Sequence, residues 1–164
     1  MLDFNSRRPQ RVALLLIIIL GVIWAVGLTQ PSPGQARGVY LPQGSTRLTA
    51  QAVETGFNIT GQVSGANVPY VYVSMLRRLY VGETTRTAVV ESRQVNVADG
   101  TFSAAFEKFK TGDWLNKIAR ELKIKDAATL RTDPVLELAV SGSPFKTAVN
   151  RDLIVASTFV GYQD

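Results

Sequence analysis

Hydrophobic residues recur along this chain with three different periods, and each period predicts a different kind of element. Residues 12–28 form one uninterrupted apolar run that contains no charge and no amide side chain. From about residue 48, apolar and polar residues alternate, which is typical of strands with one buried face. Only within residues 113–125 do apolar residues recur every three or four positions, and this spacing predicts an amphipathic helix. The chain therefore divides into an apolar N-terminal segment and a strand-rich domain.

The apolar run has the length of a membrane span. At about 1.5 Å rise per residue, residues 12–28 extend roughly 25 Å as a helix, close to the hydrocarbon thickness of a bilayer. Three arginines and one aspartate precede the run, and an excess of basic residues favours the cytoplasmic side. We therefore expect residues 1–11 to be a cytoplasmic tail and residues 12–28 a transmembrane signal-anchor helix in contact with lipid. The rest of the chain is then extracytoplasmic, at the cytoplasmic membrane.

Two alternatives to a retained anchor stay open. Gly34-Gln35-Ala36 fits a small-x-small cleavage site, so a signal peptide cleaved near Ala36 would give a secreted protein, although the apolar run is slightly long for one. Ser6-Arg7-Arg8 is similar to a twin-arginine signal, but it continues into Pro9-Gln10-Arg11 rather than into apolar residues, and no cofactor site follows. The retained anchor is our preferred interpretation.

Residues 29–47 are rich in proline and glycine. Proline cannot donate a hydrogen bond to a helix or a central strand, and glycine loosens the chain. We therefore expect a linker that separates the anchor from an extracytoplasmic domain at residues 48–164.

The domain reads as a series of short antiparallel strands. Within residues 57–63 and 70–75, apolar side chains occupy every second position, and Asp99-Gly100 predicts a tight turn because Gly100 tolerates positive φ. The last strand is apolar enough to predict a central position or cover on both faces. Six to eight short strands favour an antiparallel β-sandwich with the helix across an edge or opening. Further strands are expected at 87–97, 101–106, 135–140 and 153–160.

The predicted helix carries one apolar stripe, which includes Trp114 and Ile118. Trp114 is expected to anchor the helix to the sandwich rather than to contact a ligand. Thr111 or Asp113 is suited to cap the N-terminus of this helix, because short polar side chains accept from the free backbone N–H groups there. Pro134 is expected to open the strand that follows the helix.

Two stretches resemble known extracellular modules. The strand and turn at 57–65 and the hairpin at 97–103, which contains Asp99-Gly100-Thr101-Phe102, resemble prokaryotic immunoglobulin-like and transthyretin-like β-sandwich modules. The resemblance implies a sandwich fold and a role as a spacer, an adhesion unit or a binding module. The predicted helix is not part of the minimal module.

Composition narrows the possible functions. The 164 residues carry a net charge of +5, with basic and acidic residues interspersed, so nothing indicates a nucleic-acid partner. The chain contains no histidine and no cysteine. Ser-His-Asp and Cys-His catalysis and zinc sites built on these residues are therefore excluded. We predict a protein that is not an enzyme and has no cofactor.

The carboxylates do not indicate a metal site. None of them stands in the dense Asp-x-Asp-x-Asp-Gly spacing that wraps a hard cation in one loop. Turn, cap and pre-proline preferences explain several of them, and an acid pair of the glycosidase type is the open alternative. The candidates considered are Asp99, Asp113, Asp126, Asp133 and Glu137.

Two groups of side chains are candidates for ligand or partner contact. Tyr70 and Tyr72, with Tyr80, can form an aromatic platform for a sugar ring; the alternative is that they line the second face of a partly covered strand. The second group is basic and suits an acidic partner or lipid headgroups, with a solvated mixed-charge face as the alternative. It consists of Arg77, Arg78, Lys117, Arg120 and Lys123.

These observations support one leading hypothesis and one alternative. The leading hypothesis is a single-pass membrane protein whose non-catalytic β-sandwich is a structural or accessory component that binds another envelope or membrane protein. The alternative is an exported binding module for cell-envelope polysaccharide or another ligand; a hydrolase ranks third. Asn58-Ile59-Thr60 is also a glycosylation sequon, which matters only in a host that glycosylates exported proteins.

Overall fold

The computed structural model describes residues 38–64, 67–146 and 148–163. The chain divides into two units, Met1–Ala36 and Arg37–Asp164, and the described residues belong to the second. The expected cytoplasmic tail, the expected membrane span at 12–28 and the first part of the expected linker lie outside the described residues. Within the described ranges, no helix has both the length and the apolar character needed to cross a membrane.

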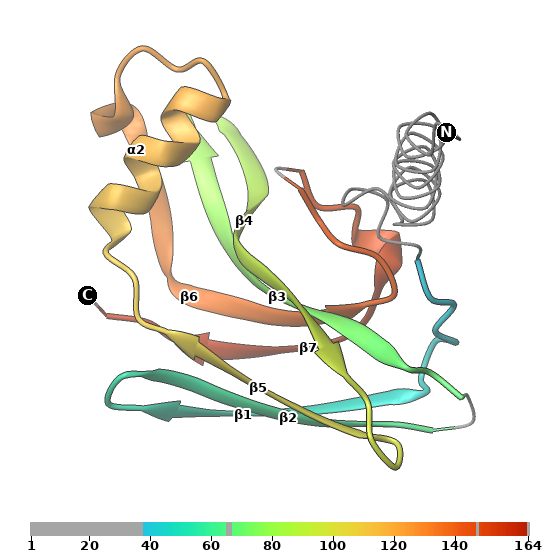
Figure 1. Ribbon diagram of the computed structural model, residues 1–164. Helices are drawn as coiled ribbons and strands as arrows, with labels where there is room; N and C mark the ends of the chain where they lie inside the picture. The colour runs from blue at the N-terminus through green and yellow to red at the C-terminus, as the bar shows by residue number, and fades with distance from the viewer. Residues whose placement is uncertain (1–37, 65–66, 147, 164) are drawn as a thin grey trace, which may run out of the picture. The chain divides into compact units, whose positions relative to one another are not determined.

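The described chain is mainly β, with two antiparallel sheets and one α-helix (Figure 1). The strand order is β1-β2-β5 in the three-stranded sheet and β4-β3-β6-β7 in the four-stranded sheet. This confirms the mainly β class and the sandwich-like arrangement that the alternation predicts. The elements are β1 (Thr46–Val53), β2 (Gly56–Val63), β3 (Tyr70–Val81), β4 (Thr84–Asn96), β5 (Thr101–Glu107), α2 (Thr111–Glu121), η1 (Ala127–Thr129), β6 (Leu130–Ser141), η2 (Arg151–Leu153) and β7 (Ile154–Gly161).

The main core lies between the two sheets. Ile59 of β2 and Phe106 of β5 pack in one cluster with Val73 of β3 and Leu138 of β6, and each is at most 2 % exposed. Apolar residues of this cluster occupy every second position along their strands, so the inner face of each sheet is apolar. Burying a side chain of this size stabilises the fold by about 1.5–3 kcal/mol. The inward-facing positions expected from the sequence are confirmed.

The Asp99-Gly100 turn is also confirmed. Both residues have positive φ, 50° and 71°, and the backbone N–H groups and carbonyls of Ala98 and Thr101 bond reciprocally at 2.8 Å. Two successive residues with positive φ match the right-handed twist of the flanking strands. The turn therefore fixes the path from β4 to β5.

The last strand differs from expectation. It occupies an edge of the four-stranded sheet rather than a central position, and its Phe159 is 63 % exposed. The prediction of a central strand, or one covered on both faces, was wrong because the apolar content of a strand does not say how many neighbours it has.

The helix α2 packs on one end of the four-stranded sheet. Trp114 and Ile118 are buried against Leu79 of β3 and Leu130, where β6 begins. The expected side-chain cap is absent: the N-cap residue is Lys110, which makes no side-chain cap hydrogen bond. The prediction of a Thr111 or Asp113 cap was therefore wrong.

Two strand boundaries differ from the sequence prediction. β6 begins at Leu130, so Pro134 lies within the strand, where the register against β3 shifts, and does not open it. Such a shift tolerates a residue without an N–H. Near the N-terminus, Leu41 is 7 % exposed and Thr46 already belongs to β1. The folded unit therefore begins inside the linker expected at 29–47.

Part of the outer face of the four-stranded sheet is covered by the described residues between β6 and β7, 142–146 and 148–153. Phe145 of this segment is 6 % exposed and packs against Leu76 of β3 and Ala139 of β6. An isolated bridge between Ala88 and Ala148 also joins the segment to β4. The segment delivers Arg151 to the candidate site.

Candidate functional site

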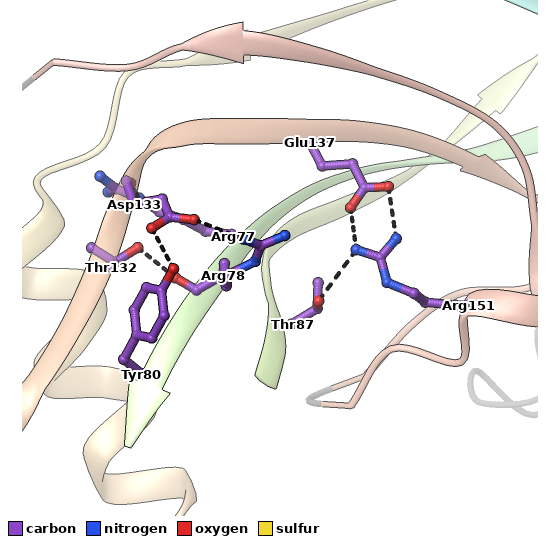
Figure 2. Close-up of polar contacts among 8 residues, drawn as sticks. All are labelled: Arg77, Arg78, Tyr80, Thr87, Thr132, Asp133, Glu137 and Arg151. Carbon is purple, nitrogen blue, oxygen red and sulfur yellow. Dashed lines mark hydrogen bonds and ion pairs between the residues drawn. The ribbon is translucent and has the colours of Figure 1, made fainter. Parts of the chain in front are cut away.

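A groove of about 220 Å³ lies on the outer face of the four-stranded sheet. We call it the charged groove, because two arginine–carboxylate pairs border it (Figure 2). Its lining comes from β3, β4, β6, η2 and β7, which are far apart in the sequence. The residues that matter to its chemistry are Arg78, Thr87, Val135, Glu137, Arg151 and Phe159.

The first pair joins Glu137 to Arg151. The Arg151 guanidinium donates to both carboxylate oxygens of Glu137, at 2.7 and 3.1 Å, and donates more weakly to the Thr87 hydroxyl at 3.4 Å. The Glu137 side chain is 6 % exposed, whereas that of Arg151 is 54 % exposed. A buried carboxylate needs such a partner, since leaving it unpaired costs several kcal/mol. The pair therefore fixes η2 on the sheet and leaves the Arg151 side chain about half exposed.

The second pair joins Arg78 to Asp133, with an N–O distance of 3.5 Å. The Tyr80 hydroxyl donates to the other carboxylate oxygen of Asp133 at 2.7 Å. The interaction with Tyr80, and next the Asp133 carboxylate, raises the pKa of Arg78 above its ordinary value. The groove thus has a second half-exposed guanidinium that stays charged.

The edge of the groove is apolar. Phe159 of β7 and Val135 of β6 are 63 % and 39 % exposed, and Phe159 lies opposite Glu137 in the strand register. Large apolar side chains beside half-exposed guanidinium groups are typical of protein-binding surfaces. Chemically, the groove is suited to a surface that supplies an apolar contact and carboxylate groups.

Arg77 and Arg78 are neighbours in sequence, but they point to opposite faces of β3. Arg77 is 5 % exposed, donates to the Asp133 carbonyl at 2.9 Å and to the Thr111 hydroxyl at 2.6 Å, and lies over the Tyr162 ring at 5.0 Å. Thr111 is the first residue of α2 rather than its N-cap, and its hydroxyl accepts from Arg77. Arg77 joins the start of α2 to the sheets, and only Arg78 presents its charge to solvent.

The structure does not bring the three candidate tyrosines together. Tyr72 is 5 % exposed, donates to Gln94 at 3.1 Å and meets Tyr70 edge to face at 5.8 Å. Burial, and next the neighbouring Tyr70, raises the pKa of the Tyr72 phenol. Tyr80 lies at the other end of β3 and bonds to Asp133. A ring buried as deeply as Tyr72 offers little area to a sugar.

The remaining candidates are dispersed. Lys117 and Arg120 lie on the exposed side of α2, and neither lines the charged groove. Asp126 caps η1 by accepting from the Ala128 N–H at 2.9 Å, and Asn58 is exposed on β2. Among the residues that the structure describes, no group of three or more acidic side chains is placed to hold a metal ion.

Sequence reasoning missed Arg151 and Phe159. The signal that points to Arg151 is Glu137, a lone charge inside the apolar run from Val135 to Val140. A charge at such a position predicts a buried ion pair. The sequence does not say which arginine completes the pair, because the partner comes from a segment without a periodic pattern.

A second depression lies on the outer face of the three-stranded sheet, with a volume of about 650 Å³. We call it the polar hollow. Hydroxyl and amide side chains and one arginine line it together with Gly61, Ala98 and Phe102, and none of these described residues forms an ion pair. Its principal side chains are Arg47, Thr49, Thr60, Gln62, Thr101 and Ser103.

Comparison with known proteins leaves the function to be argued from this geometry. No family model matches the chain, and neither a curated protein nor a solved structure matches it.

Proposed function

We propose that this chain is a single-pass, membrane-anchored protein whose extracytoplasmic domain is a non-catalytic accessory component that binds another envelope or membrane protein. The observation that carries the proposal is the charged groove, where Phe159 is 63 % exposed and the Arg151 side chain is 54 % exposed. Aromatic and arginine side chains in such settings dominate binding energy at protein interfaces.

The anchoring half of the proposal rests on the sequence. Residues 12–28 are long and apolar enough to span a bilayer, and three arginines precede them. The absence of histidine and cysteine supports a non-catalytic role. Both carboxylates of the groove are also engaged, one with Arg151 and the other with Arg78 and Tyr80. Carboxylates held in this way are positioned for structure rather than for proton transfer.

Of the two folds that the sequence resembles, immunoglobulin-like and transthyretin-like, the strand pairing supports the immunoglobulin-like one. In that sandwich the second strand pairs with the fifth, and the third with the sixth, which pairs with the seventh. Here β2 pairs with β5, β3 with β6, and β6 with β7, while β4 joins the four-stranded sheet beside β3. We therefore propose an immunoglobulin-like module with β4 at the edge of the second sheet and α2 as an addition.

Site-specific photocrosslinking in native membranes tests the binding role. A photoreactive phenylalanine analogue is placed in the full-length chain at Phe159, and the matched control carries it at Gln51, which is exposed on β1 and lines neither the charged groove nor the polar hollow. We expect one discrete crosslinked species from position 159 and none of that size from position 51. Equal labelling at both positions, or no species from 159, would contradict the proposal.

Extraction with a mild detergent followed by sizing gives a second test. The full-length protein is expected to elute in a complex larger than the free chain. Phe159→Ser should shift it to the size of the free chain, while Gln51→Ser leaves the complex unchanged. A single small species for the unaltered protein at every concentration would count against an accessory role.

A second candidate function is glycan binding through the polar hollow. A polyhydroxylated ligand suits it, because its lining offers hydroxyl, amide and guanidinium groups from β1, β2 and β5. Pull-down on cell-envelope polysaccharide tests this, with Gln62→Ala as the variant and Tyr72→Phe as the control. Retention lost only in Gln62→Ala would support the candidate, and equal retention of all three proteins would eliminate it.

A further inference from the structure

A second apolar feature lies where the described chain begins. Tyr40 is 83 % exposed and Leu153 of η2 is 43 % exposed. Both border one hollow of about 300 Å³, together with Gln43 and Asp152. Among the described residues, the other exposed large apolar side chains are Val135 and Phe159 of the charged groove. We call Tyr40 and Leu153 the arm patch.

The arm patch stands on a segment that is fixed to the fold. The Val39 N–H donates to the Gly142 carbonyl at 2.7 Å, and the Gln43 side chain donates to the Ile154 carbonyl at 3.3 Å. Between them, Leu41 is 7 % exposed in the core. Tyr40 is therefore held outward from the folded unit by its neighbours on both sides.

The chain itself limits how far this patch can be from a membrane. Nine residues, 29–37, separate the end of the apolar run from Gly38. Fully extended they reach about 30 Å, and as a flexible coil roughly 17 Å. A tether of this length keeps the arm patch at a high effective concentration near the membrane surface. Even a weak apolar contact between the patch and the membrane is then formed for much of the time.

We propose that the arm patch inserts into the interfacial zone of the bilayer that holds the anchor; this rests on the anchoring part of the proposed function. The occupant of the patch is lipid. Tyrosine suits this zone, because its ring enters the acyl boundary while its hydroxyl stays hydrated. Asp152 borders the same hollow and limits the depth of insertion to the headgroup level.

The contact also orients the charged groove. η2 carries Leu153 of the arm patch and Arg151 of the groove within three residues, and the Glu137 pair fixes η2 on the sheet. Lipid contact at Leu153 therefore sets the height and direction in which the groove faces its partner. Figure 1 shows the first described residues of the chain (cyan) beside η2, with α2 at the opposite side of the folded unit.

The test uses the absence of cysteine from the chain. Full-length single-cysteine variants Leu153→Cys, Lys117→Cys on α2 and Leu20→Cys in the apolar run are spin-labelled in phosphatidylcholine nanodiscs. Collision with oxygen, which partitions into lipid, is compared with collision with a water-soluble nickel chelate. We expect the oxygen-to-nickel ratio to be severalfold higher at 153 than at 117. Adding Tyr40→Ser should lower the ratio at 153.

The outcomes separate the two proposals. Suppose that position 20 gives the ratio expected in lipid, and that the ratio at 153 is no higher than the ratio at 117. This result would overturn the lipid contact of the arm patch and leave the anchor intact. Water values at position 20 would overturn the anchor and the contact with it.

Discussion

The outer faces of the two sheets are built differently. On the three-stranded sheet, exposed residues such as Thr49 and Thr60 alternate with more buried ones, so that face is solvated. On the four-stranded sheet, seven consecutive residues of β3, Val71 to Arg77, are buried. The six final residues of β6, Leu136 to Ser141, are buried as well. Both sheets are antiparallel, so cover by another segment, rather than strand direction, makes the difference.

Small side chains make this cover possible. Ser74, Ala139 and Ser141 lie on the covered face and are fully buried. The Ser74 hydroxyl bonds to that of Ser92 at 2.8 Å, and the Ser141 hydroxyl donates to the Ser143 carbonyl at 2.7 Å. Hydroxyls that are bonded within the protein avoid the cost of burying an unsatisfied polar group. The covered face can therefore carry the charged groove on a rigid support, whereas the solvated face keeps only the polar hollow.

The largest expected effect comes from removing the cover. Phe145→Ala deletes a buried ring from the covered face and should lower the free energy of unfolding by about 3 kcal/mol. Urea denaturation of the full-length protein in detergent measures it. A loss below that of an ordinary surface substitution would show that residues 142–153 do not stabilise the sheet.

Breaking the ion pair under the cover should have the next largest effect. Arg151→Ala leaves Glu137 buried without its bidentate partner and should cost about 1–2 kcal/mol, less than a fully buried pair because Arg151 is half exposed. Arg47→Ala on the solvated face is the matched control and should stay within about 0.5 kcal/mol. Replacing Glu137 by Gln in the Arg151→Ala background should restore part of the loss. Equal costs for the two arginine variants would argue against a stabilising pair.

Burial of Tyr72 on the outer face of the four-stranded sheet should make the free energy of unfolding depend on pH in the alkaline range. Its raised pKa means that the folded state keeps the phenol proton longer than the unfolded chain. This contribution to stability is fully present below about pH 10. As the pH rises from there toward the raised value, the unfolded chain loses its proton first and the free energy of unfolding falls. Urea midpoints at increasing pH should fall less for Tyr72→Phe than for the unaltered protein, and parallel curves would refute this.

The smallest effect is expected on the solvated face. Thr60→Val keeps a β-branched side chain at an exposed strand position and should change the free energy of unfolding by less than about 0.5 kcal/mol. The matched variant Ser74→Val adds volume to the covered face and removes the bond to Ser92, so it should cost about 1–3 kcal/mol. Similar costs in the two variants, measured by urea denaturation, would mean that the faces do not differ.

The charged groove was only partly predictable. Arg78 and the lone charge of Glu137 can be found in the sequence. The pairing of Glu137 with Arg151 cannot, because it joins positions whose segments meet only when the chain folds back over the sheet. Arg77 was a candidate of the same standing as Arg78, yet the two point to opposite faces of one strand. The Arg77-Arg78 pair, taken by itself, does not indicate which of the two arginines is buried in the fold.

Local periodicity determined which residues of β2, β3, β5 and β6 face the core and which stripe of α2 is buried, and the turn preference of Asp99-Gly100 determined where that turn lies. These features depend on contacts between residues close in sequence, or on which face of a single strand or helix a residue occupies. The order of residues along the chain specifies both. The tertiary structure decided that β7 lies at an edge, that residues 142–146 and 148–153 cover part of one sheet and that Arg151 meets Glu137. Those outcomes depend on which distant segments pack together, because the same alternating pattern is compatible with a solvated face or with a covered one.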